Sequence, residues 1–340
     1  MQLKVTTPED TRTAATEERY RLVARQQIAR YERESNQSAM DNITALVDWM
    51  SSRRPELLPK TWRQYKASVA FYLEETGHHV EASRLRQIMS DGCKSRSDNP
   101  SRQTSTLKKK HVTDHEEEVV TKHLLARKTS AWARPCLAFF KAGMIVGLRP
   151  SEWASAKLFI DGSEDTFPAY PVLRVLNGKA TNGRAHGTYR HLMLDTLEKE
   201  DLLWVRAAIT YANPNSPQGL KMPKGKAADF EEYYEGLRKE FKRTIDRLFP
   251  TKTSRITLYS SRHQFSANVK SAKYSLAEIA ALMGHGSDDT ASAHYGRKRF
   301  GRNRSGLPRP LQVEVQRIKA VYEGRPSPVE PSRKPSPSME

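Results

Sequence analysis

Apolar residues recur at helical spacing along most of the chain. Between residues 38 and 92 they return every three or four positions in successive segments, which predicts a compact all-helical unit. The stretch RRPELLP, with its two prolines, separates the first of these helices from the second. Ahead of this unit, an N-terminal extension covers residues 1–37, and its charged segment 16–34 predicts a helix with apolar positions near one face.

The second part of the chain mixes two periodicities. Strands are predicted at 171–177 and 189–194, and two Asn-Gly pairs in the connection NGKATNGRAHG mark the turns between them. Helical patterns surround this pair. They are expected at 113–128, 132–146, 196–212 and 228–249, the last being strongly amphipathic. The fold class is therefore mainly α with a small β-sheet in the C-terminal domain.

Shifts in composition suggest the domain boundaries. Residues 95–110 are rich in Ser, Arg and Lys without an apolar period and predict an exposed linker, followed by a second domain at 111–305. A helix is expected within 306–323, with Leu311, Val315, Ile318 and Val321 on one side; it can pack in cis or dock on a neighbouring protomer. The Pro- and Ser-rich tail at 324–340 is expected to be disordered.

Charge narrows the classes of partner. The 340 residues carry a net charge of +18 and the pI is near 9.8, which favours a polyanion such as nucleic acid. No apolar run reaches the length of a membrane span and no signal peptide is evident, so we expect a cytoplasmic, nucleoid-associated protein with no membrane partner. Two distant cysteines and the lack of metal or ATP motifs predict no cofactor and no metal.

Three polar residues in the stretch 257–295 are placed by helix ends. Ser275 and Glu278 form a capping box that starts a helix, and Gly284 is suited to end it with positive φ. That stop places His285 just beyond the helix end, where its ring can face a cleft. Arg262 opens the helix before, and Ser287, Asp288 and Asp289 can cap a third helix whose last turn carries Tyr295.

Two further basic residues, Arg149 and Lys179, are also candidates for a functional site. Gly147 should stop the helix 132–146 and Pro150 suits the first position of the next, so Arg149 falls near a helix start that already favours an anion. Lys179 sits in the hairpin loop, from which it can reach into a groove. Taken alone, Arg149 reads as a surface arginine; the motifs downstream of it favour a phosphate clamp.

The ordered set GLRPSE, R-H-x-F and LMGH…T…HYGR resembles the catalytic domain of the tyrosine recombinase (phage integrase) family, over roughly residues 110–300. The resemblance implies an all-helical core-binding domain at 38–94 and a mixed α/β catalytic domain, together forming a C-shaped clamp on DNA. It implies a site-specific recombinase of a mobile element, serving integration, excision, resolution or transposition. Such an enzyme acts as a tetramer on two duplexes, with an accessory DNA-binding protein as a possible partner.

The resemblance also implies roles for the matching residues. Tyr295 is the nucleophile that forms a 3′-phosphotyrosyl intermediate, Arg149 and Arg262 hold the phosphate oxygens, His285 stabilises the transition state, and Lys179 is the general acid. Neither metal nor ATP takes part. This sequence departs from the family pattern at two points. Tyr259 occupies the place where the family usually has histidine or lysine, and a phenol with a pKa near ~10 is a poor base at neutral pH. The interval from His285 to Tyr295 is one residue longer than the common form.

Basic side chains outside this set are candidates for DNA-backbone contacts, with solvated surface charge as the alternative. They are Arg53, Arg54, Lys60, Arg63, Lys66, Lys108, Lys109, Lys110, Arg297, Lys298 and Arg299. The N-terminal helix 16–34 is either a surface helix or an arm that contacts DNA or a neighbour.

Two other classes of function stay open. One is a catalytically silent DNA-binding regulator on the same scaffold. The other is a related enzyme, a type IB topoisomerase or a telomere-resolvase-like protein. Tyr259 and Tyr274 are rival nucleophiles, whereas His263 and His294 are expected to be structural.

Overall fold

The computed structural model describes residues 14–94, 108–162, 167–178, 185–213, 229–251, 255–289, 297–304 and 306–321. The chain divides into two units, the N-terminal unit at Met1–Thr104 and the C-terminal unit at Ser105–Glu340. The division falls within the predicted linker 95–110, most of which lies outside the described residues. None of the helices in the described ranges is long and apolar enough to cross a membrane.

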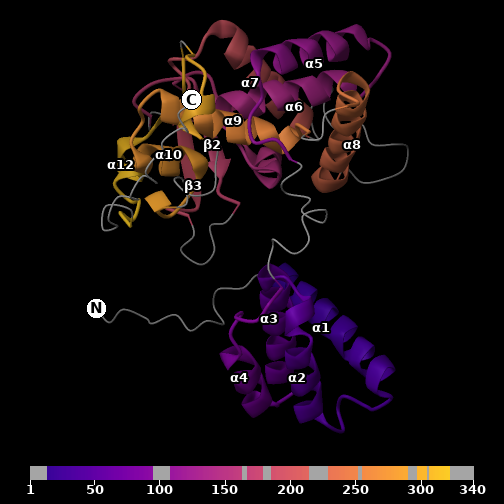
Figure 1. Ribbon diagram of the computed structural model, residues 1–340. Coiled ribbons are helices and arrows are strands. Elements are labelled where there is room, and N and C mark those ends of the chain that lie inside the picture. Colours follow the sequence, from indigo (N-terminus) through magenta and orange to yellow (C-terminus); the bar gives the residue numbers. More distant parts are fainter. Residues whose placement is uncertain are drawn as a thin grey trace, which may run out of the picture. The chain divides into compact units, whose positions relative to one another are not determined.

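The N-terminal unit consists of helices packed around one core (Figure 1). Trp62, Leu46 and Leu73 are fully buried there. Tyr31 of the first helix contributes to the same core, so this helix belongs to the unit and does not form a separate extension. The helices are α1 (Ala14–Ser35), α2 (Ile43–Ser52), the 3-10 helix η2 (Arg54–Glu56), α3 (Pro59–Glu75) and α4 (His79–Gln87).

The C-terminal unit is helical around a second core (Figure 1). The apolar helix α6 runs through the core and contacts α5, α7, α8 and α9. The predicted helices are present within a few residues at each end. They are α5 (Asp114–Ala126), α6 (Ala133–Val146), α7 (Lys199–Ala212), α8 (Phe230–Leu248), α9 (Leu258–Ser271) and α10 (Leu276–Met283), with the short 3-10 helices η5 (Pro150–Ser155) and η7 (Lys298–Phe300).

A four-stranded sheet lies at one end of this unit, beside α10, with α8 at the other end (Figure 1). The predicted hairpin is present as β2 (Val172–Leu176) and β3 (Tyr189–Met193), which pair antiparallel with Val175 opposite Arg190. Two strands were not predicted, because each is too short for a periodic pattern. They are β1 (Lys157–Phe159), which pairs with β2, and β4 (Arg309–Pro310), which pairs with β3.

The helix predicted within 306–323 is wrong in its extent. The segment first adds β4 to the sheet, and its helix α12 (Gln312–Val315) is only four residues long. Within the described residues the segment packs in cis. Glu314 accepts hydrogen bonds from the backbone N–H of His191 (3.1 Å) and faces its Nδ1 (2.8 Å). Lys319 then pairs with the backbone at Gly286, directly after α10. These tertiary contacts override the helical pattern.

Candidate active site

Arg149 lies in the short connection between the end of α6 and the start of η5. Gly147 ends α6 with φ 61°, and a Cβ there would clash with the ring of Phe265, so only glycine fits. The chain then extends through Arg149, and Pro150 starts η5 as predicted, although this element is a 3-10 helix. The Arg149 guanidinium donates to Glu152 (2.6 Å) and to the carbonyl oxygen of Gly284 (3.3 Å). Its side chain is therefore held, and only 8% of the residue is exposed.

Arg262 approaches the same place from α9. It lies in the second turn of the helix and is 1% exposed. Its Nη2 donates to the carbonyl oxygen of Met283 at 2.8 Å, and its Nη1 donates to the carbonyl oxygen of Gly147. A carboxylate oxygen of Glu152 lies 3.7 Å from the same Nη1. The two arginines that the sequence singled out, 149 and 262, therefore converge on the C-terminal end of α10.

The end of α10 is built as the sequence predicts. Ser275 and Glu278 form both halves of the capping box, and Gly284 ends the helix with φ 65°. The N–H of His285 then bonds back to the carbonyl oxygen of Ala280 at 2.9 Å, which turns the chain sharply away from the helix axis. Helical backbone resumes at Asp288 and Asp289, where a third helix was expected to begin.

His285 is buried beside these arginines, with 3% of its surface exposed. Burial, together with the positive charges of Arg262, Arg149 and Arg190, lowers the pKa of His285 to about 2. The imidazole is therefore neutral at physiological pH. A neutral ring still carries one N–H, so it can donate a hydrogen bond to a phosphate oxygen without adding a charge to be desolvated.

Sequence reasoning missed two residues at the centre of this site, Glu152 and Arg190. Arg190 is fully buried and donates to both carboxylate oxygens of Glu152, at 3.1 and 2.7 Å. Burial by itself raises the pKa of Glu152, but Arg190, Arg262 and Arg149 outweigh it and hold that pKa far below its ordinary value. One signal was available. Arg190 shares the inward face of β3 with Leu192, and an arginine at such a position needs a buried partner.

The balance of charge defines what the site can bind. Three buried arginines share a single buried carboxylate, so this group of four keeps an excess of positive charge beside a neutral histidine. Guanidinium forks match the oxygens of a phosphate. Among the described residues, no cluster of His, Cys, Asp and Glu is suited to hold a metal ion.

The remaining predicted groups fall partly outside the described residues. Lys179 and Tyr295 lie there, as does His294. The chain leading to Lys179 is anchored at the site, because the N–H of Gly178 donates to Glu152 at 3.2 Å.

The structure describes both rival tyrosines, Tyr259 and Tyr274, and also His263. Tyr259 is 37% exposed on α9 and meets the ring of His263 edge-on at 5.2 Å. Burial, with Lys110 and Arg262 nearby, lowers the pKa of His263 to about 4. The Tyr274 hydroxyl donates to the carbonyl oxygen of Leu307 (3.5 Å), and burial raises its pKa.

The basic candidates of the N-terminal unit separate into two kinds. Lys66 donates to the carbonyl oxygens of Arg86 (3.1 Å) and Ile88 (2.8 Å), so it caps the end of α4. Arg53 is buried under the ring of Trp49, and Arg54 bonds to Met89. In contrast, Lys60 and Arg63 are exposed on α3, and Nε of Arg63 donates to the carbonyl oxygen of Pro59 in the same helix at 3.3 Å.

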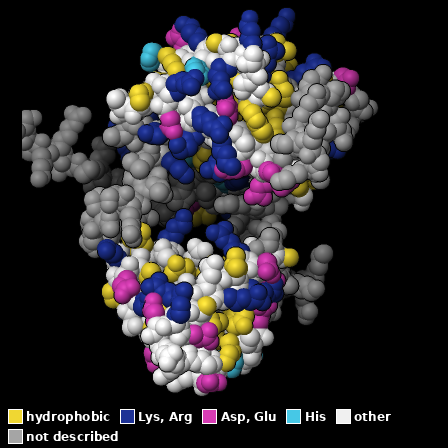
Figure 2. Space-filling view, turned by 90° about the vertical axis from the view of Figure 1, so that its right-hand side faces the viewer, with side chains coloured by type: hydrophobic (Ala, Val, Ile, Leu, Met, Phe, Trp, Pro, Cys, Tyr) yellow, Lys and Arg dark blue, Asp and Glu magenta, His cyan; other side chains and the backbone are white. Residues whose placement is uncertain are grey.

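The basic residues of the C-terminal unit that are candidates for DNA-backbone contacts lie in two segments that are close together. His111 stacks on Phe300 with ring centroids 4.0 Å apart, which brings the segment 108–110 beside η7. Lys108, Lys110, Arg297, Lys298 and Arg299 are exposed there, whereas Lys109 is held by the buried carboxylate of Glu116 at 2.8 Å. Figure 2 shows Lys and Arg side chains gathered on the face of this unit that it presents.

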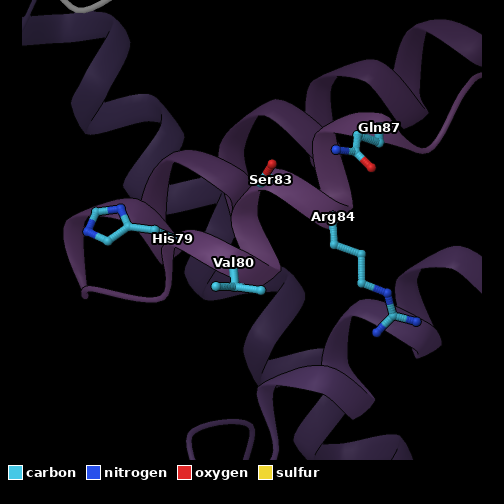
Figure 3. Close-up of a pocket in the computed structure, with 5 residues that line it drawn as sticks. All are labelled: His79, Val80, Ser83, Arg84 and Gln87. Atoms are coloured by element: carbon cyan, nitrogen blue, oxygen red, sulfur yellow. The ribbon is translucent and has the colours of Figure 1, made fainter.

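A pocket of about 460 Å³ lies elsewhere, on α4 of the N-terminal unit (Figure 3). Its lining comes from that one helix: His79, Val80, Ser83, Arg84 and Gln87. Arg84 already pairs with Asp48 at 2.6 Å, and both side chains are half exposed. The pocket therefore offers no arrangement of groups comparable to the arginine site.

Comparison with known proteins gives structural similarity only. No family model and no curated protein matches the chain. The XerH site-specific recombinase, solved bound to palindromic difH substrate as a post-cleavage complex, is 15% identical, with a TM-score of 0.48 over 83% of this chain and 74% of that one. The Tn1549 transposon integrase in complex with circular intermediate DNA is 14% identical, with a TM-score of 0.42 over 83% and 95%.

A third structure, the XerA recombinase, is 14% identical and has a TM-score of 0.35 over 83% of this chain and 86% of that one. All three proteins are described as recombinases or integrases, the class that the motifs of this chain resemble.

Proposed function

We propose that this chain is a tyrosine recombinase that cuts and rejoins DNA strands at specific sites. The observation that carries the proposal is the convergence of Arg149, Arg262 and His285, from three separate segments, on the C-terminal end of α10. The first two bring positive charge in excess of Glu152, and the third brings a neutral donor. A phosphodiester requires this combination of charge compensation and hydrogen bonding when it is attacked.

In the proposed reaction the Tyr295 oxygen attacks phosphorus and the bond from phosphorus to the 5′-oxygen breaks. The phenolic proton leaves to solvent or a nearby base, and Lys179 protonates the departing 5′-oxygen. Arg149 and Arg262 compensate the non-bridging oxygens, and His285 donates to one of them. The product is a 3′-phosphotyrosyl linkage. A 5′-hydroxyl attacks that linkage in the reverse sense, so rejoining needs no ATP.

The partner proposed is double-stranded DNA carrying a specific recombination site. Exposed basic residues on both units, Lys60, Arg63, Lys110, Lys298 and Arg299 among them, contact its phosphates, the arrangement expected of a clamp. We further propose that four copies act on two duplexes, with or without an accessory protein, to integrate, excise or resolve a mobile element. Such a protein works in the cytoplasm at the nucleoid.

A covalent trap tests this function. Wild type and Tyr295→Phe are incubated with nicked duplexes tiled across the DNA that flanks the gene, and the products are separated on denaturing gels. We expect a protein–DNA adduct with wild type alone. Binding without an adduct in either protein, also after addition of host extract, would show a DNA-binding regulator instead.

Further assays separate the related enzymes. Relaxation of any supercoiled plasmid, independent of sequence, would identify a type IB topoisomerase. Hairpin-ended products would identify a telomere resolvase. An adduct that persists in Tyr295→Phe and disappears in Tyr259→Phe would move the nucleophile to the exposed tyrosine of α9.

A further inference from the structure

The buried Arg190 joins three parts of the candidate site that are far apart in sequence. Its Nη atoms donate to Glu152, which in turn holds Arg149. Its Nη1 also donates to Asn177 Oδ1 at 2.6 Å, at the end of β2 just before Lys179. Its Nε donates to the carbonyl oxygen of Leu282 at 2.9 Å, in the last turn of α10.

These contacts continue a regular pattern at the end of α10. The carbonyl oxygens of residues 282, 283 and 284 accept in turn from Arg190, Arg262 and Arg149. A helix C-terminus carries partial negative charge on such carbonyls, which favours cations around it. Arg190 differs from the other two in its hydrogen bonds. Four of its five N–H groups donate to Glu152, Asn177 and Leu282, so its fork is used within the protein and is not aimed at a DNA phosphate.

The fit around Arg190 is close. At Gly284 a Cβ would lie 2.5 Å from Asn177 Oδ1 and 2.7 Å from Arg190 Nη1. The same asparagine is fixed on its other side, since its N–H donates to Thr188 and its Nδ2 donates to Gly187, both at 2.8 Å. Displacement of the Arg190 fork therefore displaces the end of β2 and the end of α10 together.

We propose that Arg190 is a positioning residue of the reaction: it sets Glu152, the Asn177 end of β2 and the end of α10 relative to one another, and so places Arg149, His285 and the chain that leads to Lys179. This inference rests on the proposed function. Arg190 acts through these neighbours and does not touch the phosphate. A misplacement of about 1 Å is enough to cost roughly 10²-fold in rate.

The test compares Arg190→Lys with Arg174→Lys. Lysine keeps the charge but loses the fork that holds Glu152, Asn177 and Leu282 at once. Arg174 lies on the neighbouring strand, opposite His191, and its guanidinium stands over the rings of Phe159 (4.8 Å) and Tyr189 (5.6 Å). The control thus makes the same substitution in the same sheet, away from Glu152.

We expect Arg190→Lys to slow single-turnover cleavage of the nicked duplex that gives the wild-type adduct by about 10²-fold, with its Kd for that duplex unchanged. Arg174→Lys should cleave at the wild-type rate. Asn177→Ala removes one acceptor without changing a charge, and we expect a smaller loss, roughly 10-fold. Wild-type cleavage rates in both Arg190→Lys and Asn177→Ala would overturn the inference, as would equal losses of binding and cleavage.

A second measurement does not depend on catalysis. Amide hydrogen exchange of residues 276–286 and 149–153 should be faster in Arg190→Lys than in wild type, and unchanged in Arg174→Lys. If Arg190→Lys fails to fold, the same exchange is read in Asn177→Ala. Unchanged exchange would refute the positioning role. A wild-type chain that forms no adduct on any duplex would refute the proposed function, and the exchange result would still decide whether Arg190 holds these segments.

Discussion

The guanidinium of Arg262 donates to the carbonyl oxygen of Met283 at 2.8 Å, although the two residues belong to different helices. The bond fixes the catalytic candidate of α9 against the helix that presents His285. The donor is Nη2. The other terminal nitrogen, Nη1, lies 3.7 Å from a carboxylate oxygen of Glu152, within the candidate site.

Arg262→Lys should therefore slow cleavage far more than it weakens DNA binding. Lysine cannot reach Gly147, Met283 and a phosphate with one ammonium, so we expect a loss of about 10²–10³ in the cleavage rate constant. Mobility-shift titration should give a Kd close to that of wild type. Arg206→Lys, at an exposed position of α7, is the control. Parallel losses of binding and cleavage would point to a DNA-anchoring role.

His285 makes the stability of the C-terminal unit sensitive to acid. Its pKa of about 2 in the fold lies below the ordinary value near 6.5, so below pH 6.5 the unfolded chain takes up a proton that the folded chain does not. Stability is complete above that pH and falls as the pH drops, by at most about 1.4 kcal/mol per pH unit from this group.

Urea unfolding at pH 7, 6 and 5 measures this dependence. We expect a shallower loss of stability in His285→Gln than in wild type, because the substituted residue does not titrate. His115→Gln changes an exposed histidine of α5 in the same unit and should keep the wild-type slope. The same slope in all three proteins would contradict the burial of a neutral His285.

Gly284→Ala should destabilise the C-terminal unit for two reasons at once. The residue has φ 65°, and its Cβ would enter the space of Arg190 and Asn177. Positive φ alone costs on the order of 1 kcal/mol for a non-glycine residue. Gly77→Ala isolates that contribution, because φ there is +84° and nothing lies within 4 Å of a Cβ. Chemical denaturation should show a larger loss of stability for Gly284→Ala than for Gly77→Ala. Equal losses would mean that Arg190 and Asn177 move aside without a cost in stability.

Glu314 should control how the C-terminal segment is held. It is buried, faces His191 Nδ1 at 2.8 Å and lies 3.9 Å from Nε2 of His186, whose Nδ1 reaches the carbonyl oxygen of His285 at 3.2 Å. Glu314→Ala leaves these groups with fewer partners, so we expect faster hydrogen exchange over residues 309–321. The exposed Gln316→Ala should leave that exchange unchanged. Fast exchange already in wild type would show that the segment is not held.

The basic residues of α3 should differ in what they contribute. Lys60 and Arg63 are exposed, so replacing both with alanine should weaken duplex binding and reduce its salt dependence, with no change in stability. Lys66→Met should instead lower stability, since it leaves the carbonyl oxygens of Arg86 and Ile88 without their donor. Salt titrations of binding and thermal unfolding distinguish the two effects.

Local signals made much of this site predictable. The capping box at Ser275, the glycine stops at 147 and 284 and the proline at 150 act within a few residues of sequence, and the structure has each of them. They place Arg149 and His285 at helix ends. Arg190 and Glu152 were not predicted, because they are 38 residues apart in the sequence and meet only in the folded unit.

Long-range contacts account for what the sequence did not predict. An apolar period in the segment 310–323 predicts a helix, but pairing with β3 and the bond from His191 to Glu314 hold most of it in other conformations. The basic face of the helix that carries Lys66 likewise gave no sign that this ammonium donates to the carbonyl oxygen of Ile88. Periodicity and charge report which residues share a face, but not which neighbour that face meets.

The run of accepted carbonyls at the end of α10 constrains the length of that helix. One inserted residue would turn the helix end by about 100° and advance it by about 1.5 Å, which would take all three carbonyls out of register with their arginines. An insertion between Ser275 and Gly284 should therefore separate the three arginines from their carbonyl oxygens, so the eight residues of α10 are a fixed length in this protein.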